Sequence, residues 1–166
     1  MNIYLLIDLF AKYGLYLLFI IVFLEYMNLP GLPSGIIMPA AGILVQESEM
    51  SFFMAFIISV IAGLLGSYVL YAIGYFLGKP LLNKYYTKYK RLQKPIDRAL
   101  AFTEKHGNKG IFFARLIPVA RTIVSLTAGI FRMNIWAFSF YSVIGIAFWN
   151  IAYIYAGYAF GYYFLK

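Results

Sequence analysis

Cysteine is absent from this chain of 166 residues, and histidine occurs only once, at His106. Without cysteine the chain has neither disulfide bonds nor thiolate ligands for a metal ion. The single histidine lies in a basic segment, so a histidine-based metal site or a serine–histidine pair inside an apolar segment is not expected. We therefore expect no metal, no cofactor and no enzymatic activity.

Charged residues are also scarce. They make up 12% of the chain, whereas 63% of the residues are hydrophobic and 20% are aromatic. A soluble domain of this size cannot bury so much apolar surface, so the composition indicates an all-α integral membrane protein.

The net charge of +8 could suggest a nucleic acid partner, but nine of the 14 Lys and Arg residues lie between Lys79 and Lys109. A basic segment beside a membrane helix is typical of a cytoplasmic loop on anionic lipid. The expected partners are therefore membrane lipids and not nucleic acids. Whether the chain forms a homo-oligomer is left open.

One apolar stretch contains two charges and a helix breaker. Residues 110–130 have the sequence GIFFARLIPVARTIVSLTAGI, with Arg115, Pro118 and Arg121 in the middle. A charge at membrane depth costs at least about 2.5–3.5 kcal/mol, and a proline should break the helix between the arginines. Broken backbone at this depth needs protein or a water-filled cavity around it. We interpret the stretch as a re-entrant hairpin that Gly129 closes; the alternative is a kinked spanning helix.

A second broken stretch covers residues 29–43, LPGLPSGIIMPAAGI. Pro30, Pro33 and Pro39 exclude an uninterrupted helix, so this stretch is the second candidate for a re-entrant hairpin. The other segments favour helices or loops, in this order: an interfacial helix at 3–12, a short span at 13–28, an acidic loop at 44–51, a long span at 52–78 that Pro80 ends, the basic loop at 79–109, and a long span at 135–165.

Three short matches relate the two halves of the chain. The matching segments are Ala41–Ile43 and Ala128–Ile130, Ser59–Ile61 and Ser142–Ile144, and Gly74–Gly78 and Gly157–Gly161. The first pair is separated by 87 positions and the other two pairs by 83. Gly42 thus corresponds to Gly129, and each half consists of a hairpin followed by one long span.

A hairpin returns the chain to its starting side, whereas a single span crosses the membrane. The two hairpins should therefore enter from opposite sides, which is an inverted-topology repeat with a substrate site between its broken segments. We predict one membrane domain over residues 1–166, with a first repeat at about 29–78, the cytoplasmic basic loop at 79–109 and a second repeat at about 110–165.

The ionisable residues near the breaks suggest a phosphate ligand. Guanidinium groups bind phosphate oxygens in a bidentate way and stay charged, so Arg115 and Arg121 are the main candidates. Glu25 could pair with an arginine or carry a coupling proton, or it could be an ordinary interfacial glutamate.

Neutral polar residues are weaker candidates. Ser34 and Ser125 could donate hydrogen bonds to a ligand, although such residues often bond to backbone in membranes. Asn150, the one amide in the last long span, could line a cavity or bond to a neighbouring helix.

A longer pattern resembles the DedA family of bacterial inner-membrane proteins, also described as the SNARE-associated or VTT domain. The pattern is Glu25…Pro30-Gly-Leu-Pro33-Ser…Pro39-Ala-Ala-Gly42 with Phe113-x-Arg115-x-x-Pro118-x-x-Arg121-x-x-x-Ser125-x-x-Ala128-Gly129. The resemblance implies two opposed re-entrant segments, with Glu25, Arg115 and Arg121 essential. Many members have Glu or Asp where this chain has Gly35, so a coupling role for that acid does not transfer.

The resemblance implies a flippase that moves undecaprenyl phosphate or a phospholipid such as phosphatidylethanolamine between leaflets, linked to the proton motive force. A scramblase without an energy source and a proton or ion antiporter are the alternatives. Two arginines in the cavity disfavour a cation substrate. A lipid phosphatase would need a nucleophile and a base, and no histidine is placed for that role.

The opposed hairpins predict the side on which each loop lies. Because the chain has no cysteine, single cysteines can be introduced at Ser48 and Asn108 and labelled in intact and permeabilised cells. Ser48→Cys should react with an impermeant maleimide from outside, and Asn108→Cys only after permeabilisation. Labelling of both from the same side contradicts the inverted arrangement.

Overall fold

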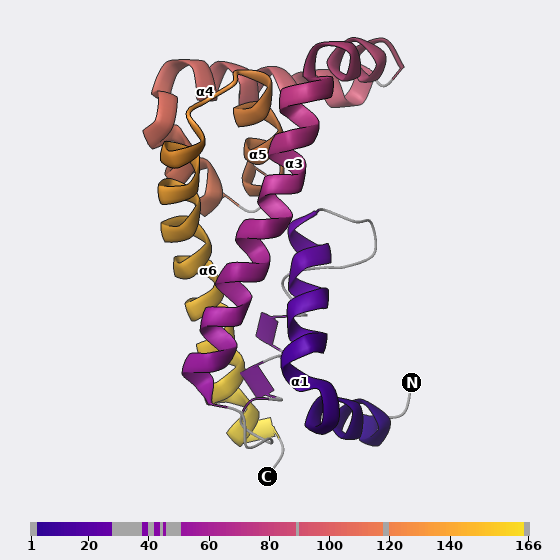
Figure 1. Cartoon of the computed structure of the whole chain (residues 1–166), viewed down its shortest axis with the longest axis vertical. Coiled ribbons are helices and arrows are strands. Elements are labelled where there is room, and N and C mark those ends of the chain that lie inside the picture. The colour runs from indigo at the N-terminus through magenta and orange to yellow at the C-terminus, as the bar shows by residue number, and fades with distance from the viewer. Residues whose placement is uncertain are drawn as a thin grey trace. The chain divides into compact units, whose positions relative to one another are not determined.

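The computed structural model describes residues 3–27, 38–39, 42–43, 45, 51–88, 90–117 and 120–164. The regular structure in these ranges is helical, which confirms the all-α class (Figure 1). The helices are α1 (Ile3–Tyr26), α3 (Phe52–Lys88), α4 (Lys90–Leu116), α5 (Ala120–Ile130) and α6 (Ile135–Phe164).

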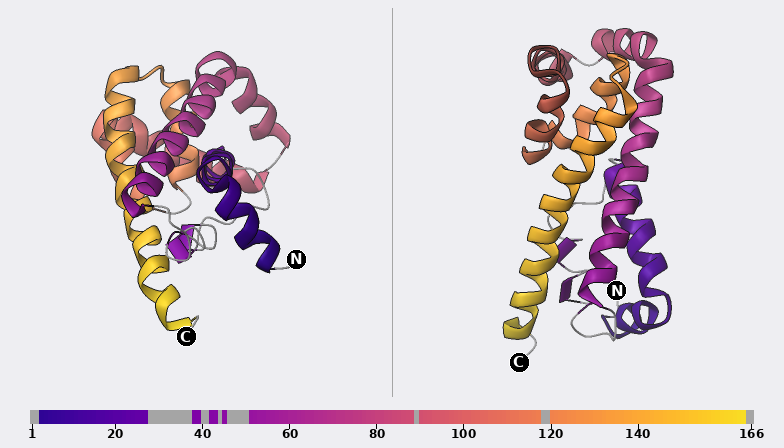
Figure 2. Two further views of the ribbon diagram at one scale, coloured as in Figure 1. Left: turned by 60° about the horizontal axis from the view of Figure 1, so that its bottom comes forward. Right: turned by 60° about the vertical axis from the view of Figure 1, so that its left-hand side comes forward.

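Two of these helices are long and apolar enough to cross a membrane. The candidate spans are Phe52–Gly78 within α3, with 27 residues, and Ile135–Ala159 within α6, with 25 residues. At about 1.5 Å per residue both exceed a hydrocarbon core of about 30 Å. Both helices run without a break (Figure 2). The two long spans expected from the sequence are thus confirmed as helices of suitable length and composition.

Two predicted helix boundaries are wrong. The sequence predicts that Pro80 ends the helix that begins at residue 52, but α3 continues through Pro80 to Lys88. A proline removes one backbone hydrogen bond and bends a helix, and the following residues still favour helix. The segments 3–12 and 13–28 were expected to be separate, but both belong to α1, which is bent near its beginning (Figure 1).

The basic segment 79–109, which we expect to be helical in part, is helical over the residues that the structure describes. Its first part completes α3, and its second part belongs to α4, which starts at Lys90. The backbone of α4 is non-helical at Gly107, with φ 54° and ψ −138°. Residues with a Cβ rarely adopt this conformation, so a glycine is required at this kink. The part of α4 that contains Arg115 follows this kink.

The predicted helix break between the two arginines is confirmed. The last residue of α4 is Leu116 and the first residue of α5 is Ala120. Pro118 lies outside the described residues, as do Pro30, Pro33 and Ser34 of the first predicted hairpin.

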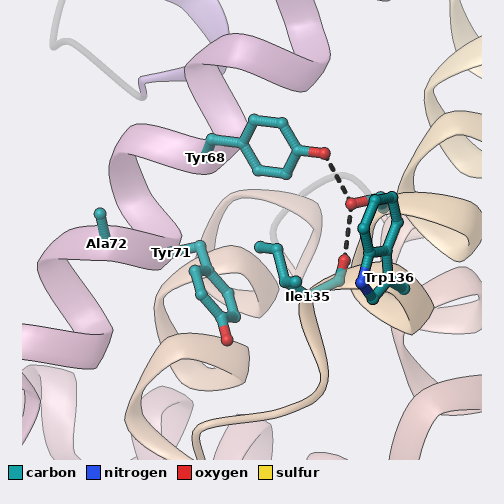
Figure 3. Close-up of a pocket in the computed structure, with 6 residues that line it drawn as sticks. Tyr68, Tyr71, Ala72, Ile135 and Trp136 are labelled. Atoms are coloured by element: carbon teal, nitrogen blue, oxygen red, sulfur yellow. Dashed lines mark hydrogen bonds between the residues drawn. The ribbon is translucent and has the colours of Figure 1, made fainter.

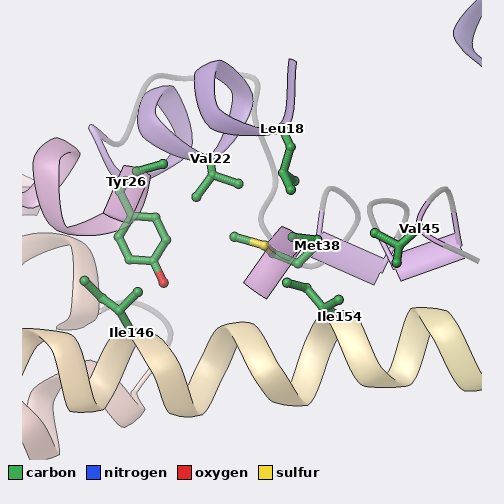
Figure 4. Packing of buried hydrophobic residues seen from close by; sticks show 9 residues of the cluster. Leu18, Val22, Tyr26, Met38, Val45, Ile146 and Ile154 are labelled. Carbon is green, nitrogen blue, oxygen red and sulfur yellow. The ribbon is translucent and has the colours of Figure 1, made fainter. Parts of the chain in front are cut away.

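The chain divides into two compact units. Unit 1 comprises Met1–Gly66 and Ile146–Lys166, and unit 2 comprises Ser67–Gly145. In unit 1, buried side chains of α1 and α6 form one apolar core together with Met38 and Val45 (Figure 4). The core of unit 2 consists of Tyr71, Ile111, Ala114, Val124, Ala128 and Phe138.

Within unit 1, two glycines allow backbone-to-backbone contact with α6. A methyl group at Gly42 would overlap the carbonyl oxygen of Ile154, and a methyl group at Gly157 would overlap the carbonyl oxygen of Pro39. Small residues permit such close approach between membrane helices.

Within unit 2, the same pair of contacts joins α5 to α3. A methyl group at Gly129 would overlap the carbonyl oxygen of Tyr71, and one at Gly74 would overlap the carbonyl oxygen of Leu126. Gly129 therefore lies inside α5 and does not close a hairpin, contrary to the prediction from the sequence. Residues with a Cβ could not occupy these positions without moving the helices apart.

Alanine at Gly42 or Gly129 should destabilise the protein. Overpacking costs about 1–3 kcal/mol, which exceeds the gain in helix propensity of at most about 1 kcal/mol. The melting temperature in detergent should fall for Gly42→Ala and Gly129→Ala, whereas Ala152→Val, at an exposed position on α6, should leave it nearly unchanged. Wild-type melting temperatures for both glycine variants would contradict the backbone contacts.

Candidate functional site

Arg115 is the largest fully buried side chain of the described residues, with an exposed fraction of 1%. It lies in the last turn of α4, directly before the break. Its Nη2 atom donates hydrogen bonds to Ser125 Oγ in α5 at 3.0 Å and to Ser142 Oγ in α6 at 2.9 Å. Both serines are buried as well. The guanidinium group thus connects three helices of unit 2.

One face of α6 forms a seat for this side chain, made by Phe138, Ser142 and Gly145. Residues three and four apart lie on the same side of a helix. The Arg115 Cζ atom is 5.6 Å from the centroid of the Phe138 ring, a cation–π distance. A Cβ atom at Gly145 would come within 2.9 Å of Arg115 Cδ. Glycine therefore makes room for the aliphatic stem.

These contacts offset the cost of burying the charge. Desolvation of an ion costs several kcal/mol, while a hydrogen bond to a charged group contributes about 1.5–3 kcal/mol and a desolvated cation–π contact about 2 kcal/mol. The two serine hydroxyls are neutral acceptors, so these two bonds do not neutralise the positive charge. Hydroxyl oxygens occupy positions that phosphate oxygens can also take.

Arg121 lies in the first turn of α5 and is half-buried. Its backbone N–H bonds to the carbonyl oxygen of Ile117 at 2.9 Å. The first turn of a helix carries a partial positive charge. The convergence of Arg115 and Arg121 on one point stays a prediction.

In unit 1, Asn150 connects helices. Its Oδ1 atom accepts a hydrogen bond from Tyr26 Oη at 2.8 Å, and its Nδ2 atom donates to Ser59 Oγ at 3.0 Å. Bonding to neighbouring helices, one of the two roles considered for Asn150, is therefore what its contacts support. Glu25 lies beside Tyr26 at the end of α1 and is buried, with an exposed fraction of 4%.

Of the residues singled out from the sequence, the structure brings Arg115 and Ser125 together. Glu25 and Asn150 belong to unit 1, while the arginines and Ser125 belong to unit 2. Within the described residues, no three His, Asp or Glu side chains form a metal-binding group.

Sequence reasoning missed the seat on α6. From the sequence alone, Ser142 is considered only as part of the repeat. A serine followed three positions later by a glycine, within an apolar span, could have indicated a site at which a polar side chain packs on the helix.

Comparison with known proteins places these residues in a family context. The family model described as VTT domain matches residues 32–159. Protein DedA of Escherichia coli strain K12 is 34% identical over 161 residues, covering 93% of this chain and 73% of that protein. Undecaprenyl phosphate transporter A of Staphylococcus aureus is 33% identical, covering 89% of this chain and 74% of that protein. The Bacillus subtilis protein of the same name is 37% identical, with 76% and 64% covered. No solved structure gives a significant match.

Replacement of Ser142 by alanine should destabilise unit 2 more than the same change at Ser139. Ser142→Ala removes a hydrogen bond to a buried charge, worth about 1.5–3 kcal/mol. Ser139→Ala, one turn away on α6, removes the bond from Tyr68, which joins neutral groups and is worth about 0.5–1.5 kcal/mol. It also removes the bond from Ser139 to the Ile135 carbonyl oxygen, a side-chain-to-backbone bond within a helix that does not stabilise the helix. Thermal unfolding in detergent measures the difference, and Ser142→Thr should restore most of the loss. An equal loss of stability in the two alanine variants would contradict the hydrogen bond between Ser142 and the buried Arg115 charge.

Proposed function

Because the chain belongs to the VTT domain family, we propose that it moves a phosphate-bearing lipid between the leaflets of a bacterial membrane. The single observation that carries the proposal is the buried Arg115 guanidinium, which two neutral hydroxyls hold in place. Two similar proteins are named undecaprenyl phosphate transporter A, which supports a lipid phosphate as the substrate. Undecaprenyl phosphate and a phospholipid such as phosphatidylethanolamine both have the required group.

The proposed architecture is an inverted repeat of two re-entrant hairpins. Each hairpin is followed by a long spanning helix, within one membrane domain over residues 1–166. The glycine contacts support this architecture, because they occur in both units. The contacting residues of unit 1 and unit 2 are separated by the same numbers of positions as the matching segments of the sequence repeat. Gly42 and Gly129 differ by 87 positions, and their contact residues Ile154 and Tyr71 differ by 83.

In the proposed mechanism, Arg115 and Arg121 hold the lipid phosphate while the headgroup crosses. An isolated charge in hydrocarbon costs tens of kcal/mol in the Born limit, so the guanidinium groups replace the water around it. Ser125 and Ser142 occupy the acceptor positions when no lipid is bound, and a phosphate oxygen displaces one of them. The acyl or prenyl chains remain in the bilayer throughout.

Release requires that this binding be reversible. Glu25 is the residue that carries the coupling proton in this proposal, and its ionisation and protonation accompany release. This step couples transport to the proton motive force, with the basic segment 79–109 on the cytoplasmic side. Transport of this kind changes no covalent bond, so the protein is a transporter and not an enzyme. The alternatives are an energy-independent scramblase and a proton or ion antiporter.

Transport should depend on both arginines. In proteoliposomes with a fluorescent phospholipid, quenching by an impermeant reductant measures translocation. Arg115→Ala with Arg121→Ala should abolish it. Arg→Lys at either site keeps the charge but loses the planar guanidinium group, which binds phosphate oxygens through two parallel donors. This change should slow transport about tenfold or more.

Arg98→Ala, at an exposed position on α4, is the matched control and should transport at nearly the wild-type rate. A proton gradient across the same vesicles separates a flippase, whose rate it raises, from a scramblase, whose rate it leaves unchanged. Wild-type translocation by the double alanine variant would contradict the mechanism and make the arginines structural.

A further inference from the structure

Unit 2 contains a pocket of about 450 Å³ that does not include Arg115 or its partners. Figure 3 shows Tyr68 reaching from α3 toward Trp136 at the beginning of α6. The lining residues are Tyr68, Tyr71, Ala72, Ile135, Trp136 and Ser139. A volume of this size is typical of ligand sites.

The hydroxyl groups in the wall of the pocket bond to each other and to the backbone. Ser139 Oγ donates to the carbonyl oxygen of Ile135 at 2.6 Å, so Tyr68 Oη donates to Ser139 Oγ, also at 2.6 Å. Tyr71 Oη donates to the carbonyl oxygen of Met133. The wall therefore offers a ligand mainly apolar and aromatic surface, which favours hydrocarbon over a polar molecule.

Both helices that line the pocket contribute membrane-spanning segments. Tyr68, Tyr71 and Ala72 belong to the span in α3, and the other lining residues begin the span in α6. Trp136, at the beginning of that span, has an exposed fraction of 81%. Tryptophan in this position is typical of the boundary between hydrocarbon and headgroups. The pocket thus lies where a lipid has both its chain and its headgroup nearby.

A positive charge is fixed next to the pocket by the turn between α5 and α6. Arg132 lies two residues after the end of α5 and has φ 50°, and the backbone N–H of Met133 bonds to the carbonyl oxygen of Ala128 at 3.0 Å. This is a Schellman-type helix end, at which glycine is the usual residue. The Arg132 Cζ atom lies 5.0 Å from the centroid of the Tyr75 ring. Tyr75 in turn stacks on Tyr71, which lines the pocket.

Arginine at this position is unfavourable for the backbone, because a side chain with a Cβ is strained at positive φ. The residue is exposed, and its guanidinium group lies over an aromatic face. An exposed arginine at the headgroup level attracts anionic lipids. Hydrocarbon walls beside a fixed cation are complementary to a lipid with a negative headgroup.

We propose that this pocket binds one hydrocarbon chain of an anionic membrane lipid whose headgroup contacts Arg132. The site is distinct from the arginine site of the transport mechanism and does not depend on transport. It retains a lipid at the surface of unit 2, where the chain packs against Ala72 and Trp136.

Fluorescence quenching of Trp136 tests the proposal directly. The chain has two tryptophans, so Trp149→Phe leaves Trp136 as the single reporter in vesicles. Phosphatidylglycerol and phosphatidylcholine with brominated acyl chains, at equal mole fraction, serve as quenchers. The anionic lipid should bind about fivefold more strongly, equivalent to about 1 kcal/mol for one arginine at a charged surface.

Variants separate the two parts of the site. Arg132→Gln should remove the preference for phosphatidylglycerol, and Arg132→Lys should keep it. Ala72→Leu fills the pocket and should lower quenching by phosphatidylglycerol to the level of phosphatidylcholine. Ala152→Leu, an exposed change elsewhere on α6, is the matched control and should behave like the parent.

Equal quenching by both lipids in the parent protein would overturn the proposal, as would a full preference in Arg132→Gln. Quenching that disappears as the protein-to-lipid ratio rises would assign the pocket to a second copy of the chain and also overturn it. The variant with alanine at both Arg115 and Arg121 should keep the preference. A failure of the transport mechanism is therefore distinguishable from a failure of this site.

Discussion

A guanidinium group inside an apolar helix bundle needs acceptors for its N–H groups and space for its stem, and Arg115 obtains both from α5 and α6. The hydroxyls of Ser125 and Ser142 accept hydrogen bonds from Nη2, and Gly145 leaves room for the stem. These contacts require the helix break before α5, because an unbroken helix would continue α4 in a straight line. They also determine which face of α6 is turned toward α4. The contacts of Arg115 therefore both hold the charged group and determine how α4, α5 and α6 pack locally in unit 2.

The glycine contacts constrain the structure in a different way. In unit 1, Gly42 packs on the backbone of α6, and Gly157 of α6 packs on the backbone of Pro39. In unit 2, a glycine of α5 packs on the backbone of α3, and a glycine of α3 packs on the backbone of α5. Such reciprocal contacts hold a short helix by close packing, since hydrophobic burial contributes little between helices in lipid.

Much of this structure could be predicted from the sequence, for physical reasons that differ between elements. The two spans follow from length and composition, and the break near Pro118 follows from the missing donor. Arg115 could be singled out because a charge in an apolar stretch is costly. The course of α3 beyond Pro80 could not be predicted, because proline can either bend or end a helix. The seat on α6 depends on which face of that helix meets Arg115. Because α6 is apolar on all sides, its sequence does not indicate which face this is. Pattern alone could not distinguish Gly129 as a packing residue from a turn residue.

Contact between the arginines and a lipid phosphate is the central claim, and a distance between the two groups tests it most directly. Solid-state NMR can measure dipolar coupling between ¹⁵N in labelled arginine side chains and ³¹P in a bound lipid phosphate. In an Arg132→Gln background, which removes the headgroup contact of the separate lipid site, the account predicts a coupled guanidinium signal that decreases in Arg115→Lys and in Arg121→Lys and disappears when both changes are combined. A coupled signal that is unchanged in the double variant, or the absence of any coupling in the wild-type protein, would contradict it.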